Sequence, residues 1–417
     1  MTADLAGVAE KVRSGQRLDH GDGMRLYRSR DIFTIGRLAD EVRRRLHGRI
    51  AYYNINRHIH YTNYCVLRCR FCSFFRPYSG HDVSPGSARE PGRTRDTVRD
   101  GESPALSGAR EPEPGSGGPG SGYALRVEDV VRLACEARDR GATEVHIVGG
   151  LHPKLPFSYY LDLCRGIRAA CPTMHIKAFT AIEIIHFTRI ARPRLSIVEV
   201  LEQLREAGLG SLPGGGAEIF DDRVHEEAFR SKVGEQGWFD VHRAAHALGI
   251  FSNATMLYGH VERPEERIAH MIKLREHQDA SLRERRAHFQ CFIPLPFIPE
   301  GSGLAHLPGT TGLDDLKTLA IARLMLDNVP HIKAFWIMQG PKIAQVSLDW
   351  GVDDLDGTVV HYDITKRDGA GAHQEMTADQ LRRLIIEAGR VPVERDTLYR
   401  PVDRRPTDPR TAGPEGR

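Results

Sequence analysis

The chain has 417 residues and carries 58 Lys and Arg against 55 Asp and Glu, which gives a formal net charge of +3 at pH 7. This small excess does not predict a nucleic-acid partner, which would need a strongly basic surface. The seven cysteines are an odd number and argue against a secreted disulfide framework. Residues 1–16 lack the apolar core of a signal peptide, and no apolar run reaches the length of a membrane span. We therefore expect a cytoplasmic protein without a membrane partner.

The N-terminal residues predict helices at 5–12 and 35–46, because their apolar residues recur at helical spacing. Asp31 and Thr34 are candidate caps for the second helix, and Gly21 and Gly23 predict a break between the two. Residues 50–61 are rich in Ile and Tyr and predict one strand. A helical extension at 1–49 is thus expected in front of a larger domain at 50–400.

From residue 126 onward, helical and strand-like patterns alternate, as in the βα units of a parallel sheet. The expected helix and strand pairs are 127–140 with 144–148, 159–170 with 175–179, 197–207 with 210–212, 238–248 with 251–258, 265–279 with 288–293, and 313–327 with 331–338. With the strand at 50–61 there are about seven strands, so the sequence predicts an α/β fold, a TIM-type barrel that is partial or complete.

Two segments have a composition that does not support a packed core. Residues 79–122 are rich in Gly, Pro and Ser and contain no aromatic residue, so we expect a disordered insertion. Residues 401–417, rich in Pro, Arg and Gly, predict a disordered tail.

Three cysteines follow the first predicted strand. Cys65, Cys69 and Cys72 have C-x3-C-x2-C spacing, which lets one tight loop direct three soft thiolates towards one metal centre. A cubane [4Fe-4S] cluster needs four ligands, so three cysteines leave one iron open to an exogenous molecule. A structural zinc knuckle with His58 or His60 as fourth ligand, or a chance grouping, would be the alternatives. The other four cysteines lie on apolar faces and are expected to be buried.

The spacing, with Phe71 just before the third cysteine, resembles the radical S-adenosylmethionine (SAM) superfamily. The resemblance implies a [4Fe-4S] cluster whose open iron binds SAM and whose electron releases a 5'-deoxyadenosyl radical. It also implies that Gly149 and Gly150, after the second strand, contact the methionine end of SAM through exposed backbone groups. Leu151 occupies the position that is usually acidic after this glycine pair.

Strand ends supply further polar candidates. Glu183 and Glu218 could accept hydrogen bonds from ribose hydroxyls, and three glycines before Glu218 give a ligand room there. His260 lies after the fifth strand, where its near-neutral intrinsic pKa would suit an acid or base. The sequence His-Ile-Lys-Ala-Phe occurs at 175–179 and at 331–335, so Lys177 and Lys333 would both enter the cavity if that strand face is interior.

Longer blocks narrow the resemblance to the aminofutalosine synthase family of the futalosine route to menaquinone. The blocks are 175–183, 212–220, 253–262, 331–338 and 393–399. The resemblance implies addition of the radical to the double bond of 3-[(1-carboxyvinyl)oxy]benzoate, then rearrangement and decarboxylation to 6-amino-6-deoxyfutalosine. SAM would be a co-substrate, and a flavodoxin or ferredoxin would donate the electron.

A substrate with two carboxylates needs cationic or donor groups, which Lys177, Lys333, His58 and His260 could supply. Three alternatives remain open: dehypoxanthine futalosine cyclase, a radical SAM enzyme that makes a flavin-type cofactor, and a non-catalytic, metal-stabilised binding module.

Overall fold

The computed structural model describes residues 3–78, 122–284, 286–359, 362, 364 and 375–404. The predicted disordered insertion, apart from Gly122, lies outside the described residues, as does the predicted tail from residue 405. The first residues of that tail are described: the Val402 N–H donates to Glu394 O at 2.9 Å, and Arg404 is paired with the Glu394 carboxylate.

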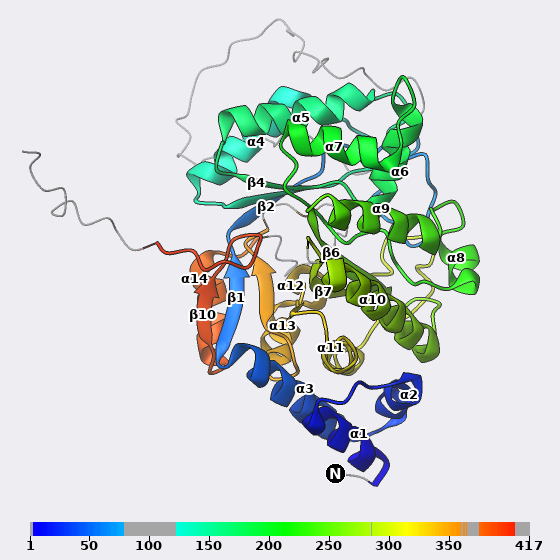
Figure 1. Ribbon diagram of the computed structural model, residues 1–417, viewed down its shortest axis with the longest axis vertical. Helices are drawn as coiled ribbons and strands as arrows, with labels where there is room; N and C mark the ends of the chain where they lie inside the picture. The colour runs from blue at the N-terminus through cyan, green and yellow to red at the C-terminus, as the bar shows by residue number, and fades with distance from the viewer. Residues whose placement is uncertain are drawn as a thin grey trace, which may run out of the picture.

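The main sheet is a curved half-barrel of seven strands, all paired in parallel (Figure 1). Its order follows the chain: β2 (Asn56–Ile59), β3 (Glu144–Ile147), β4 (His175–Ala178), β5 (Ser211–Leu212), β6 (Phe251–Tyr258), β7 (Phe289–Pro296) and β8 (His331–Ile332). The prediction of an α/β, TIM-type barrel is confirmed in its partial form.

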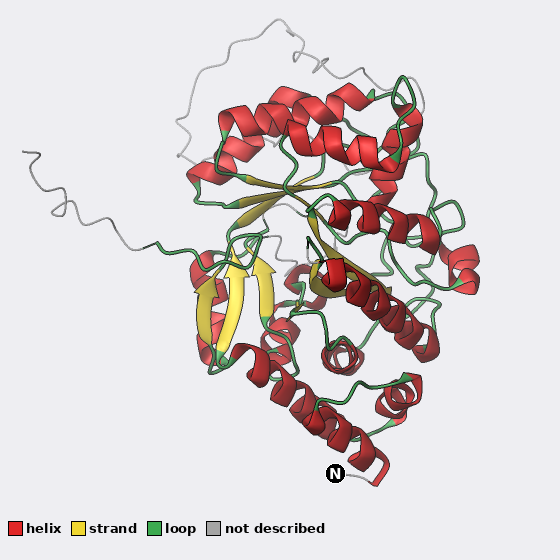
Figure 2. Cartoon of the chain, in the orientation of Figure 1, coloured by secondary structure: helices red, strands yellow, loops and turns green. Residues whose placement is uncertain are grey.

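Helices cover the outer face of the half-barrel (Figures 1 and 2). They are α4 (Val127–Asp139), α5 (Phe157–Ala170), α6 (Ala181–Ile190), α7 (Ile197–Ala207), α9 (Glu235–Ala247), α10 (Pro264–Glu284) and α11 (Gly312–Met325). The helix α7 shows how the sequence defines such an element: Ser196 and Glu199 form a capping box at its start. Val200, Leu201 and Leu204 recur at helical spacing and are buried against the sheet side.

A second, three-stranded sheet lies beside the open seam of the half-barrel (Figure 2). It has the order β10 (Val391–Glu394), β1 (Ile50–Asn54), β9 (Asp354–Gly357), with α14 (Ala378–Glu387) packed on it. The expectation of one strand at 50–61 is therefore wrong: β1 and β2 belong to different sheets. The segment after β9 bonds to β2, since the His58 N–H donates to Val359 O at 2.8 Å, so β9 helps to close the seam between β8 and β2.

Of the N-terminal helices, α2 (His20–Arg28) packs against α10 and α11, and α3 (Ile32–His47) packs against α11. The first helix, α1 (Ala3–Ser14), packs on α2 and α3. Asp31 caps α3 as expected, accepting from the Thr34 N–H at 3.1 Å. The predicted break at Gly21 and Gly23 is wrong, because both lie in α2. A Cβ on Gly23 would come 2.5 Å from Ile268 Cδ1, so this glycine allows close packing of α2 on α10.

Six of the described helices were missed by the sequence patterns: α2, α6 and α14, together with the short helices α8 (Asp222–Ala228), α12 (Trp336–Gln339) and α13 (Pro341–Ser347). The helix α12 replaces the second half of the strand expected at 331–338. It is held there by the Trp336 indole N–H, which donates to Gly357 O at 2.8 Å. Among the helices that the structure describes, none is long and apolar enough to cross a membrane.

Candidate active site

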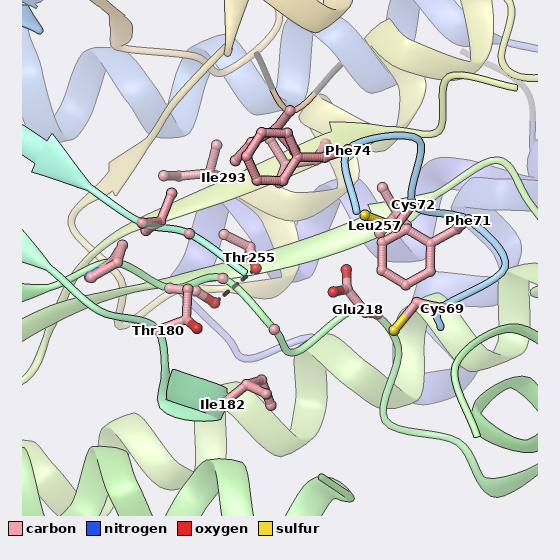
Figure 3. A pocket seen from close by; sticks show the side chains of 18 of the residues that line it. Cys69, Phe71, Cys72, Phe74, Thr180, Ile182, Glu218, Thr255, Leu257 and Ile293 are labelled. Carbon is pink, nitrogen blue, oxygen red and sulfur yellow. Dashed lines mark hydrogen bonds between the residues drawn. The ribbon is translucent and has the colours of Figure 1, made fainter. Parts of the chain in front are cut away.

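A cavity of about 270 Å³ lies inside the half-barrel and is bordered by residues of β2, β3, β4, β6 and β7. Cys65, Cys69 and Cys72 line one end of it, in the loop that follows β2. Figure 3 shows Cys69 and Phe71 beside Glu218, with Thr180 and Thr255 farther along the same cavity. The cysteines and the strand ends thus meet in one cavity.

The cysteine loop is held by backbone hydrogen bonds at both ends. The Cys65 N–H donates to Arg76 O at 3.0 Å, and the Cys72 N–H donates to Cys69 O at 3.1 Å. The Val66 N–H donates to Leu151 O at 3.0 Å, which ties the loop to the segment after β3. These bonds turn the three sulfurs towards the cavity without any bond between them.

Burial raises the pKa of the Cys69 thiol to about 12, and it raises the pKa of Cys65 and Cys72 as well. The ammonium group of Lys232 opposes this effect at all three thiols. A metal centre must therefore displace the thiol protons when it binds.

The three sulfurs are not grouped as the ligands of one bound ion would be. In the described part of the chain, no group of three ligand atoms that includes these sulfurs lies within 4.8 Å of one another. A tetrahedral zinc with Zn–S bonds of about 2.3 Å requires such a group when it is bound. A cubane cluster, in which each thiolate binds a different iron, does not require it.

Gly149 and Gly150 lie at the end of β3, next to the cysteine loop. A Cβ on Gly150 would come 2.3 Å from Tyr64 O, so only glycine allows this close approach. The Gly149 N–H donates to Glu183 Oε1 at 3.1 Å. Both glycines border the cavity.

Glu183 caps α6 and is fully engaged by protein donors. Its Oε1 also accepts from the Tyr61 hydroxyl at 2.7 Å, and its Oε2 accepts from the Thr180 N–H at 2.7 Å. Burial raises the pKa of Glu183 to about 7, while these donors oppose the rise. The structure thus gives Glu183 a role in holding the Gly149 turn; contact with a ribose stays a prediction.

Glu218 lines the cavity and is paired with Lys232 through its Oε1. Its Oε2 makes no hydrogen bond to any described residue. Lys232 lies 5.1 Å from the centre of the Phe71 ring, over the cysteine loop. Burial lowers the pKa of Lys232, but Glu218 and the thiols outweigh it, so the net shift is upward.

Lys232 is a site residue that the sequence did not reveal. It belongs to no strand end and to no recognisable motif, because it lies in the loop between α8 and α9. His146 on β3, Asp356 on β9 and Tyr362 also line the cavity and were also missed by the sequence analysis.

His58, His146 and Lys177 form what we call the inner row. The strand register places them directly opposite one another on β2, β3 and β4. Lys177 is paired with Glu144 at 2.8 Å, and Lys333, which also lines the cavity, is paired with Asp356 at 2.8 Å. Both predicted lysines therefore border the cavity, each already facing a carboxylate.

His260 is placed differently. It does not line the cavity, and its Nε2 contacts Leu257 O at 3.0 Å. Its Nδ1 lies 3.4 Å from Glu262, which also pairs with Arg267. The structure does not bring His260 together with the other predicted residues, and its catalytic role stays a prediction.

Comparison with known proteins agrees with this geometry. Residues 59–274 match the family model of the radical SAM superfamily, and residues 286–407 match that of the CofH/MqnC C-terminal region. The chain belongs to the radical SAM superfamily and, within it, to the group of related enzymes that includes aminodeoxyfutalosine synthase. Enzymes of this superfamily use a [4Fe-4S] cluster and SAM.

Individual relatives cover nearly the whole chain. An aminodeoxyfutalosine synthase of Thermus thermophilus is 45% identical over 95% of this chain and 96% of its own, and one of Streptomyces coelicolor is 40% identical over 94% and 92%. A cyclic dehypoxanthine futalosine synthase of Halalkalibacterium halodurans is 31% identical over 95% and 94%. The crystal structure of methylornithine synthase shares the fold, with a TM-score of 0.65 at 17% identity over 92% of this chain and 96% of that one.

Proposed function

We propose that this enzyme adds the 5'-deoxyadenosyl radical of SAM to the double bond of 3-[(1-carboxyvinyl)oxy]benzoate. Rearrangement and loss of carbon dioxide then give 6-amino-6-deoxyfutalosine, a step in menaquinone biosynthesis. The relatives named aminodeoxyfutalosine synthase support the reaction. The observation that carries it is a single cavity with three cysteines at one end and a row of basic side chains at the other.

Cys65, Cys69 and Cys72 would hold the [4Fe-4S] cluster, which when bound supplies the electron that cleaves SAM. The polar groups around the cysteines match the polar groups of SAM. The Lys232 ammonium would bind its carboxylate, and the free Oε2 of Glu218 would accept a ribose hydroxyl. The backbone at Gly149 and Gly150 leaves room for the methionine end. A flavodoxin or ferredoxin would bring the electron to the cluster.

Lys177, Lys333 and His58 would bind the enol ether deeper in the half-barrel. Each lysine ammonium has three donors, of which the paired carboxylate uses one, so donors remain for a substrate carboxylate. Leu257, Ile293 and Phe335 supply apolar walls that exclude water from a radical.

The test is anaerobic incubation of the reconstituted, reduced enzyme with SAM and the enol ether, followed by mass analysis of the nucleosides. We expect 6-amino-6-deoxyfutalosine. A Cys69→Ala enzyme is the matched control and should give no product. Cleavage of SAM without this product, or turnover of dehypoxanthine futalosine instead, would assign the chain to a different reaction within the group.

A further inference from the structure

The inner row lies deeper in the half-barrel than the cysteine loop. Along the chain, His146 comes four residues before Gly150, where an added Cβ would lie 3.1 Å from Cys65 Cβ. Since His58 and Lys177 are in register with His146, all three side chains enter the cavity at the same depth. A ligand group bound by this row therefore reaches deeper into the half-barrel than a group bound at the cysteine loop.

His58 has no polar partner in this row. Both of its ring nitrogens are buried and without a hydrogen bond, and among the described residues that line the cavity no other side chain has such an atom. The His146 ring centre lies 4.3 Å from that of His58, and the Tyr362 ring meets it edge-on at 5.4 Å. An imidazole buried without partners is costly, so a polar ligand group is expected against it.

The fixed charges around His58 already balance. Lys177 faces Glu144, Lys333 faces Asp356, and Arg395 faces Asp354. A ligand carboxylate would therefore add a negative charge to the inner row. Among the described residues at this depth, no unpaired cation offsets that charge. Burial makes an uncompensated charge expensive.

The histidines are the groups that can acquire the missing positive charge. Burial, together with the neighbouring His146, His60 and Lys333, lowers the pKa of His58 well below its ordinary value, and Glu144 only partly opposes this. Burial likewise lowers the pKa of His146 to about 3. Both rings are therefore neutral in the free enzyme at pH 7. Phe335 and Tyr362, which also face His58, carry no charge at that pH.

We propose that the inner row is the binding site for an aryl carboxylate and that His58 takes up one proton from solvent when this carboxylate binds. Either ring nitrogen receives the proton, and the imidazolium then donates a hydrogen bond to the carboxylate. The inference rests on the proposed function, which supplies a substrate with two carboxylates. One of these is attached to the double bond that reacts and stays near SAM, so the benzoate carboxylate is the one that reaches the inner row.

Calorimetry measures the proton directly. The reconstituted enzyme with SAM but without reductant, so that no turnover occurs, is titrated anaerobically with the enol ether at pH 7.5 in buffers of different ionisation enthalpy. We expect uptake of about one proton per substrate bound, and an affinity that falls with rising pH. The analogue 2-phenoxyacrylate, which lacks the ring carboxylate, should bind about tenfold or more weakly, without proton uptake.

Variants assign the proton to His58. His58→Asn keeps a neutral donor and should bind the enol ether without proton uptake, whereas His306→Asn, an exposed histidine, should match the wild type. Zero proton uptake by the wild type, or uptake that is unchanged in His58→Asn, would overturn the inference; the wild-type result does not depend on the folding of any variant. If the enol ether does not bind at all, the proposed function fails instead.

Discussion

The buried pair of Glu144 and Lys177 allows a quantitative test of what holds the inner row in place. The carboxylate is 1% exposed and the ammonium side chain 5%, and Nζ lies 2.8 Å from Oε2. At this distance, and at an effective dielectric constant of about 20, the attraction is about 6 kcal/mol. Desolvation of both groups offsets much of this attraction, so the pair as a whole contributes little net free energy to stability. Removal of one partner nevertheless costs much stability, because it leaves the other charge buried and unpaired.

Replacing Glu144 by Gln keeps the shape and an acceptor for the Thr397 hydroxyl, which donates to Oε2 at 2.6 Å. It leaves the Lys177 ammonium buried and unpaired, so we expect a loss of about 3–5 kcal/mol in the free energy of unfolding. Burial already lowers the pKa of Lys177, and removal of Glu144 should lower it further.

The assay is denaturant unfolding of the wild type, Glu144→Gln, Lys177→Met and the double variant. The double variant should be more stable than the sum of the two single losses predicts, with a coupling energy of about 2 kcal/mol or more. Additive losses, or a Glu144→Gln enzyme as stable as the wild type, would refute the view that this pair is a buried, mutually compensating charge pair.

The remaining predictions concern the cysteines, the cofactor pocket and the N-terminal packing. Cys69→Ala should lose the iron and all turnover, while Cys164→Ala, a buried cysteine outside the cavity, should keep the iron content of the wild type; iron and sulfide analysis decides. Glu218→Gln should raise the Kd for SAM by about ten- to a hundredfold, because a hydrogen bond to a charged acceptor contributes about 1.5–3 kcal/mol; equal affinity at equal iron content would remove Glu218 from the ribose site. Gly23→Ala should destabilise the protein by about 1–3 kcal/mol, since its Cβ would meet Ile268; Ile268→Val should recover part of the melting temperature, and no loss in Gly23→Ala would contradict the packing argument.

Local patterns were sufficient for much of the fold. The alternation of helical and strand spacing predicted the parallel half-barrel, because the 3.6-residue period of a helix and the two-residue period of a strand are both visible within a short stretch of sequence. The same patterns failed where a long-range contact decides the outcome. The strand expected at 331–338 gives way to α12, where the Trp336 indole bonds to Gly357 O, and Gly23 allows α2 to pack closely on Ile268, which lies far along the chain.

By itself, the sequence determined the kind of chemistry. The three cysteines lie within eight residues, so their spacing indicates one metal centre, and the resemblance to the radical SAM superfamily makes that centre a cluster with an open iron. The strand ends indicate where a ligand lies. Only the tertiary structure decided which charges face that ligand. Lys177 and Lys333 meet Glu144 and Asp356, while His58 meets no partner. These pairings join distant segments, so they depend on how the sheet curves and closes. The spacing of residues within one segment does not contain that information.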